Sequence, residues 1–406
     1  MFLNLIFTVL SVFSIWFIFF KPSPPKILGI YSVPDKWFLI KYYLFYVLFK
    51  LRLRQKKTKG GGFESKSKSN QNEMESGQEL PAAHPKAVDA VFMNGSNSEG
   101  FYLVAATARR HENTVQTIFL IRIPGLGILE LPQAPETNLK ADKKVNSYAA
   151  GGLEMKCVEP MKSWTLKFSG RLQLNRKSTL PVEADLKWSA CNPFFDFDTD
   201  TSARSLARAV AREPWSREFF KKLKSAHQTH YEQFGQLTGQ LKVGLNKSYQ
   251  LKLTGMRDHS YGNSRDWGDI HRYTMNMFHL ENGTVGNVAL VSMPQATMSH
   301  MEFGFICSKD GTNIPVDRVE QSLHQVGEIL PPPTVFQLNF WAGGKRYELV
   351  FEVIDQASFF MGTAWEGKLF ENFCRVSLDG VRGYGIAEWS YRHIGGRKML
   401  ENGKIY

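Results

Sequence analysis

The feature that most constrains how this chain can fold is a series of short runs, from residue 87 to residue 391, in which apolar and polar side chains alternate. Alternation with a period of two is typical of a β-strand with one buried face. Clusters of Gly, Asn, Asp and Pro separate the runs, as at the Asn282-Gly283 turn. The pattern predicts a mainly β protein made of two consecutive antiparallel barrels or strongly bent sheets, with a pair of β-sandwiches as the alternative.

One segment interrupts the β pattern. Residues 202–226 contain good helix formers after a Thr/Asp-rich start, and Pro214 divides them into two parts. We therefore expect a first barrel at 87–268 that carries a helical insertion, a second barrel at 269–395 and a short tail at 396–406.

The N-terminus has the composition of a membrane anchor. Residues 2–20 form an uncharged apolar run that is long enough to cross a bilayer as a helix. No basic residue precedes the run, whereas Lys21 and Lys26 follow it. This favours an uncleaved anchor at 1–20 over a cleaved signal peptide, and the positive-inside rule then places the C-terminal region in the cytosol. We expect a single-pass membrane protein of the endoplasmic reticulum or another endomembrane.

Most of the formal net charge of +12 lies next to this anchor. Residues 21–59 contain ten Lys or Arg and one acid, Asp35, so the rest of the chain is nearly balanced. An apolar, aromatic stretch at 37–49 lies within this segment and is interrupted by Lys41. The combination predicts a basic interfacial helix on an anionic lipid surface, with a second, short span as the alternative, and no nucleic-acid partner. Residues 60–86 are rich in Gly, Ser, Lys and Glu and predict a disordered tether.

Three N-glycosylation tripeptides begin at Asn94, Asn246 and Asn282. Such tripeptides matter only in a lumenal protein, so their modification would argue against the cytosolic orientation.

Residues 255–267 concentrate charged and aromatic side chains directly after a strand-like run at 249–254. Asp258 and His259 are candidates for a general acid and base, because a buried carboxyl can stay protonated and imidazole titrates near neutrality. If the strand continues, Asp258 faces one side while His259 and Tyr261 face the other. We therefore select His259 and Tyr261 as the inward pair, with Asp258 structural or reached from across the fold. A salt-bridged strand end is the alternative interpretation.

A weaker copy of this motif follows near the C-terminus, where 388–391 repeat the pattern of 258–261 and indicate two related halves. Together the two stretches supply the candidate ligand-binding residues. These are Arg257, Arg265, Asp266, Trp267, Glu388, Trp389 and Tyr391.

We expect neither a metal nor a cofactor. The alternating Asp196, Asp198 and Asp200 lack the glycine and terminal glutamate of a calcium loop, and no phosphate loop, nucleophile elbow or zincin motif occurs. The cysteines are far apart and are interpreted as separate reduced thiols.

The run at 255–262 with Arg265, Asp266 and Trp267, together with 193–197 and 385–391, resembles the lipocalin-like carotenoid hydratase (hydroxyneurosporene synthase)/AttH superfamily. It is more similar still to the N-terminal region of animal phosphoenolpyruvate-synthase-like (rifampicin-phosphotransferase-like) proteins. The resemblance covers residues 87–395 and implies two calycin-type, lipocalin-like barrels side by side. Kinase domains follow this region in the phosphotransferase-like relatives but not in this chain, so the resemblance implies no kinase activity here.

Hydratase relatives add water to an isoprenoid double bond by protonation without a cofactor, and the matching residues here are His259 and Tyr261. Tyr261 stands where the motif often has Trp. The resemblance therefore implies a membrane-tethered, cofactor-independent hydratase/lyase or isomerase that hydrates, isomerises or cyclises an apolar lipid or isoprenoid. The alternatives are a non-catalytic lipid-binding module and an accessory domain of a phosphotransferase-like system.

Overall fold

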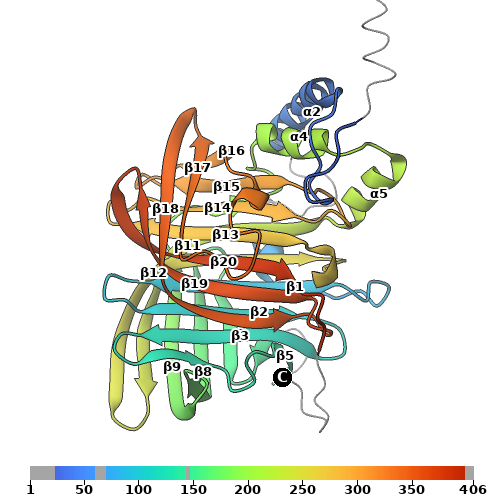
Figure 1. Cartoon of the computed structure of the whole chain (residues 1–406). Coiled ribbons are helices and arrows are strands. Elements are labelled where there is room, and N and C mark those ends of the chain that lie inside the picture. The colour runs from blue at the N-terminus through green and yellow to red at the C-terminus, as the bar shows by residue number, and fades with distance from the viewer. Residues whose placement is uncertain (1–22, 60–69, 143–146, 398–406) are drawn as a thin grey trace, which may run out of the picture.

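The computed structural model describes residues 23–59, 70–142 and 147–397, and Figure 1 shows their arrangement. The predicted anchor at 1–20 and most of the predicted tail at 396–406 lie outside these ranges. Within them, none of the helices combines the length and the apolar character that crossing a bilayer requires.

The first half of the chain forms a twelve-stranded antiparallel sheet. Its strands are β1 (Val88–Ser96), β2 (Tyr102–Arg109), β3 (Thr114–Ile123), β4 (Gly127–Glu130), β5 (Asn138–Lys140), β6 (Tyr148–Ala150), β7 (Leu153–Glu159), β8 (Ser163–Leu174), β9 (Ser178–Ala190), β10 (Phe195–Asp196), β11 (Gln228–Val243) and β12 (Lys247–Gly262). The pairings run from β11 through β12, β1, β2, β3, β4, β8 and β9 and return to β11. Strands β5, β7 and β10 branch from this ring, and β6 pairs with β7.

The second half is a closed eight-stranded barrel. It consists of β13 (Arg272–Leu280), β14 (Val285–Ser292), β15 (Met301–Cys307), β16 (Asn313–Val319), β17 (Val335–Ala342), β18 (Lys345–Met361), β19 (Gly367–Leu378) and β20 (Val381–Arg392), with β20 pairing back to β13. The prediction of a mainly β chain is confirmed. The second barrel is confirmed too, whereas the first sheet is branched because one edge of β8 pairs with both β4 and β7.

The helices are few. They are α2 (Phe38–Lys59), α3 (Gln71–Glu75), α4 (Ala203–Arg212) and α5 (Arg217–Ser225), with single 3₁₀ turns η1 (Trp267–Asp269) and η2 (Leu323–Gln325). The predicted insertion is therefore present as α4 and α5, which Ser202 and Ser216 cap by accepting backbone N–H bonds. Helices α2, α4 and α5 gather at one end of the molecule beside β15 and β16 (Figure 1).

The two halves share a core. Trp164 and Trp188 are fully buried inside the first sheet, and Trp389 is fully buried inside the barrel. A third apolar cluster joins residues of both halves, such as Phe195 and Phe234 with Phe305, and the rings of Phe195 and Phe305 stack 4.5 Å apart. We call this contact between the sheet and the barrel the seam.

Part of the predicted tether is ordered. Residues 70–86 contain α3, and Met74 and Glu75 at its C-terminal end are almost completely buried. The prediction of disorder is therefore wrong for 70–86. It relied on the average composition, which is polar, whereas Met74 and Glu75 in this stretch contact buried partners. Residues 60–69 lie outside the described ranges.

Candidate functional site

Strand β12 places the residues of the central motif on two opposite faces, as alternation requires. Arg257 points into the first sheet, where its guanidinium lies 5.2 Å from the Trp164 ring and 4.9 Å from the Trp188 ring. Asp258 points the other way, towards the seam, where its charge interacts with that of Glu388 from the barrel. The residues of β12 that face the interior of the first sheet and those that face the seam therefore lie in two separate environments.

The inward environment is a closed network around His259. This imidazole is fully buried, its Nε2 lies 2.6 Å from Asp89 Oδ1 and 3.1 Å from Tyr148 Oη, and its Nδ1 lies 2.8 Å from Tyr231 Oη. Although burial alone would raise the pKa of Asp89, His259 and Arg109 hold it below its usual value. The half-buried Tyr261 ring packs 5.2 Å from His259.

Glu75 completes this network from α3. Its carboxylate accepts hydrogen bonds from Arg257 Nη1 (2.8 Å), Tyr231 Oη (2.6 Å) and Trp164 Nε1 (2.7 Å). Burial raises and Arg257 lowers the pKa of Glu75, and the balance is a lowered pKa. Each ring nitrogen of His259 already faces a protein partner, so the predicted catalytic pair lies in a network that stabilises the fold.

The outward environment is a group of titratable side chains at the seam, which we call the seam cluster. It contains His230, Glu232, Asp258, Arg265, Tyr273, Glu371 and Glu388. The barrel side is tied by a 2.6 Å hydrogen bond that Tyr273 Oη donates to Glu388, and Glu371 lies opposite Glu388 on the neighbouring strand. On the sheet side, His230 Nε2 lies 3.1 Å from Glu232 Oε1.

Three carboxyls of the seam cluster, Asp258, Glu371 and Glu388, hold their protons more tightly than exposed carboxyls do. Burial, with Glu232 and Glu388 nearby, raises the pKa of Asp258 to about 6, and the residue is 8% exposed. Burial and the adjacent Glu388 raise the pKa of Glu371 well above its ordinary value. Burial also raises the pKa of Glu388, so each carboxyl of this close pair makes ionisation of the other harder.

The pKa of His230, on the base side of the seam cluster, is raised as well. Burial alone would lower the pKa of His230, but its hydrogen bond to Glu232 and the nearby Asp258 raise it. Both oxygens of Glu371 are buried, and this carboxyl interacts with the neighbouring Glu388. A protonated acid and an imidazole held at one seam can give and take protons, which is the chemistry that the sequence assigns to the central motif.

The predicted ligand-binding residues divide between these places. Arg265 is at the seam, where it donates to Gln228 Oε1 (2.6 Å) and Ser260 Oγ (2.8 Å). Asp266 pairs with Lys86 and accepts from the backbone of Gly268, so it caps η1.

Trp267 is buried, and its Nε1 donates to Gln116 at 3.3 Å.

Trp389 and Tyr391 are core residues of the barrel. Arg272 lies 5.5 Å from the Trp389 ring and 4.7 Å from the Tyr391 ring and donates to Glu328 at 2.9 Å. This arrangement of a buried arginine, aromatic rings and a glutamate repeats that of Arg257 in the first sheet. In the C-terminal copy of the motif at 388–391, Trp389 and Tyr391 therefore have a structural role.

The sequence analysis did not select His230, Tyr273 or Glu371 as site residues. His230 is in β11, and its signal was its place in an alternating run that continues to residue 243. Glu371 and Glu388 come together only through the register of β19 and β20, which nothing in the local sequence reveals.

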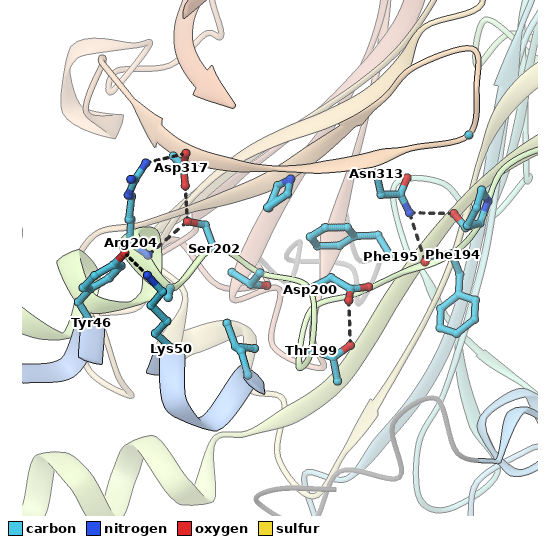
Figure 2. Close-up of a pocket in the computed structure, with 16 residues that line it drawn as sticks. Tyr46, Lys50, Phe194, Phe195, Thr199, Asp200, Ser202, Arg204, Asn313 and Asp317 are labelled. Carbon is cyan, nitrogen blue, oxygen red and sulfur yellow. Dashed lines mark hydrogen bonds and ion pairs between the residues drawn. The ribbon is translucent and has the colours of Figure 1, made fainter. Parts of the chain in front are cut away.

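A separate pocket of about 600 Å³ opens between α2, the segment 193–204 and the β15–β16 hairpin (Figure 2). Tyr46 and Lys50 of α2 line one side, and Ser202 donates to Asp317 at 2.5 Å on another. Asp200 accepts from the backbone N–H of Asp196 at 3.0 Å, so this Asp-rich stretch forms a turn. Across residues 23–59, 70–142 and 147–397, no group of three or more His, Cys, Asp or Glu is placed to hold a metal ion.

Comparisons with known proteins identify a family and a fold. The model of a family described as "Family of unknown function (DUF8627)" matches residues 5–391. Among solved structures, a putative AttH from Nitrosomonas europaea is 10% identical, with a TM-score of 0.50 over 78% of this chain and 97% of that one. No curated protein is significantly similar in sequence.

Two further solved structures are similar at lower scores. CghA with Sch210972 is 11% identical, with a TM-score of 0.48 over 79% of this chain and 93% of that one. Kievitone hydratase from Nectria haematococca is 14% identical, with a TM-score of 0.41 over 75% and 88%. At such identities the similarity concerns the fold alone, and the putative AttH, at a TM-score of 0.50, supports the AttH-type resemblance at that level. The relationship to animal phosphoenolpyruvate-synthase-like proteins stays a prediction.

Proposed function

The chain belongs to the DUF8627 family, a family of unknown function, and we propose that it is a membrane-tethered lipocalin-like protein that performs acid–base chemistry on an apolar lipid or isoprenoid. The observation that carries the proposal is the seam cluster. It combines two carboxyls whose pKa is raised, Asp258 and Glu371, with an imidazole–carboxylate pair, and apolar side chains of both halves surround it.

Six of the seven members of the seam cluster have a role in this proposal. Asp258 is the proton donor, because a carboxyl with a pKa of about 6 can transfer its proton at neutral pH more readily than water can. His230, oriented by Glu232, is the base that accepts a proton from water or from the substrate. Tyr273 holds Glu388 by its hydrogen bond, and Glu371 shares the proton of that pair.

The reaction that fits these groups is protonation of a carbon–carbon double bond. Asp258 adds a proton to one carbon, and the cation that forms on the neighbouring carbon then takes water or loses a different proton. The first outcome is hydration and the second is isomerisation or cyclisation. Neither outcome changes the oxidation state of the substrate overall or requires a cofactor.

Membrane tethering supports an apolar substrate. Residues 2–20 are uncharged and apolar, and the ten basic residues of 21–59 follow them. Such a segment holds the β domains beside a bilayer, in which isoprenoids and other lipids dissolve. We propose that the C-terminal region lies on the cytosolic side of an endomembrane.

A non-catalytic lipid-binding protein is the second candidate. The pocket in Figure 2 favours it, because the pocket is lined by Phe194, Phe195 and Leu53 but by no member of the seam cluster. An accessory domain of a phosphotransferase-like system remains a third proposal, which rests on the sequence resemblance alone.

The test is solvent deuterium incorporation. The full chain is incubated in D₂O with liposomes made from a total cellular lipid extract, and the lipids are analysed by high-resolution mass spectrometry. We expect deuterium in a subset of unsaturated lipids with the wild type, and a loss of about 10²–10⁴-fold with Asp258→Asn or His230→Gln. Asp185→Asn is the matched control, because Asp185 is an exposed acid paired with Lys167. Incorporation that survives Asp258→Asn, or a wild type that retains lipid without exchanging deuterium, would exclude the enzyme and favour the binding protein.

A further inference from the structure

The exposed apolar residues of the described chain are concentrated on one helix and the turn before it. Seventeen large apolar side chains are exposed, and ten of them lie between residues 27 and 51. The outward set on α2 follows helical spacing and comprises Leu39, Ile40, Tyr43, Leu44, Val47, Leu48 and Leu51, each between 49% and 64% exposed. The other seven are scattered over residues 158–394. A continuous apolar stripe of this kind on a protein surface marks a contact with a lipid or a partner.

The opposite face of α2 is fastened to the protein. Phe45 packs on α4 and α5, with its ring 5.0 Å from that of Trp215 and 5.9 Å from that of Phe220. One turn earlier, Lys41 is buried, and its ammonium donates to Asp35 (2.8 Å) and to the carbonyl of Glu213 (2.9 Å). The helix is therefore held in one rotational setting, with its apolar stripe pointing away from the protein.

Basic residues lie on the elements next to the stripe. Helix α5, which packs beside α2, exposes Arg217, Lys221, Lys222 and Lys224 against one acid, Glu218. Lys50 and Arg52 follow the apolar stretch on α2 itself. An apolar face with a basic border matches an anionic bilayer, whose surface attracts Lys and Arg by about 1 kcal/mol each.

We infer that α2 lies in the plane of an anionic membrane, with its stripe among the acyl chains and its inner face on α4 and α5. The contacts of Lys41 favour an interfacial helix over a second span. A span would move Lys41 away from Asp35 and the carbonyl of Glu213 and into hydrocarbon, at a cost of at least about 2.5 kcal/mol. The inference goes beyond the tether of residues 1–20 and does not depend on chemistry at the seam cluster.

The contact has a consequence for the pocket in Figure 2. Tyr46 and Lys50 line that pocket from α2, so a membrane-bound α2 brings the pocket to the level of the lipid headgroups. An amphiphile that leaves the bilayer would meet this pocket first.

The test measures lipid contact at single positions in the full chain. Leu44→Cys and Leu48→Cys are each made in a background with Cys157→Ser and Cys191→Ser, which replaces the two cysteines that are not buried. An environment-sensitive fluorophore is attached, and the protein is reconstituted into nanodiscs of phosphatidylcholine and phosphatidylserine. Leu245→Cys is the matched control, because Leu245 is an apolar residue that is 95% exposed in the β11–β12 turn.

We expect nitroxide-labelled lipids to quench the fluorophore at positions 44 and 48 several-fold more than at position 245. Equal quenching at all three positions would show that only the N-terminal segment holds the protein at the membrane, and would overturn the inference. A concentration-dependent disulfide between two Leu44→Cys chains without lipid quenching would also overturn it, because a second copy would then cover the stripe. Neither result bears on deuterium incorporation, so the two proposals can fail separately.

Discussion

Replacing Glu75 by Gln tests whether the network around His259 is structural. The change keeps the shape of the side chain but removes the charge that balances Arg257, which is completely buried. Gln cannot replace the carboxylate as acceptor for Arg257, Tyr231 and Trp164 together, and the remaining partners of the guanidinium, such as Gln233 at 3.1 Å from Arg257 Nη2, carry no negative charge. Removing one partner of a buried pair costs roughly 3–5 kcal/mol, so we expect Glu75→Gln to lower the free energy of unfolding by that amount.

The assay is urea denaturation of the full chain in mild detergent, followed by tryptophan fluorescence, since Trp164 and Trp188 flank Arg257. Combining Glu75→Gln with Arg257→Met should restore much of the loss, because no charge is then stranded. Asp185→Asn, which breaks an exposed pair with Lys167, should cost at most about 1 kcal/mol. A loss below about 1 kcal/mol for Glu75→Gln, or a double variant less stable than either single variant, would refute the reasoning.

Three further predictions follow from the same structure. Because the folded pKa of Asp258 is about 6 against an ordinary 3.8, the folded state binds the extra proton, and wild-type stability should fall as pH rises from about 4 to about 6. Asp258→Asn should flatten that fall in pH-dependent denaturation and be more stable than the wild type at pH 7 by up to about 3 kcal/mol; a less stable variant would contradict this. Glu328→Gln in the barrel should cost less than Glu75→Gln in the same denaturation assay, since the Glu328 side chain keeps 16% of its exposure; an equal or larger loss would argue against burial as the cause. In cells we expect no glycan on the chain. A glycosidase-sensitive band that Asn246→Gln or Asn282→Gln removes would show that the C-terminal region is lumenal and contradict the predicted topology. Asn94 is not suitable for this test, because it is buried and accepts a hydrogen bond from the backbone of Met256.

Local sequence rules predicted the parts of the fold that depend on local sequence. Alternation identified the strands and the two faces of β12, and Ser202 and Pro214 marked the helical insertion. The branching of the first sheet at β8 was not predictable, because it depends on which distant strands share an edge.

The candidate site shows the same limit. The motif revealed Asp258, Arg265 and Glu388, but their neighbour Glu371 depends on the register of β19 against β20. Glu75 was hidden for a different reason: the polar composition of 60–86 predicts disorder, while this carboxylate meets Arg257 across 182 positions of sequence. Sequence patterns describe residues that are close along the chain. The network around His259 and the seam cluster are instead formed by residues that are far apart in the sequence and close in space.

The central claim is that the seam cluster raises the pKa of its carboxyls Asp258 and Glu371, and infrared spectroscopy measures this without a substrate. The C=O stretch of protonated carboxyl groups is recorded from pH 4 to pH 8 for the wild type, Asp258→Asn and Glu371→Gln. We expect one band that titrates at about pH 6 and is missing in Asp258→Asn, and a second that persists above the pH at which exposed glutamates ionise and disappears in Glu371→Gln. A wild type in which no band persists above the pH at which exposed carboxyls ionise, or bands unchanged in both variants, would contradict the account.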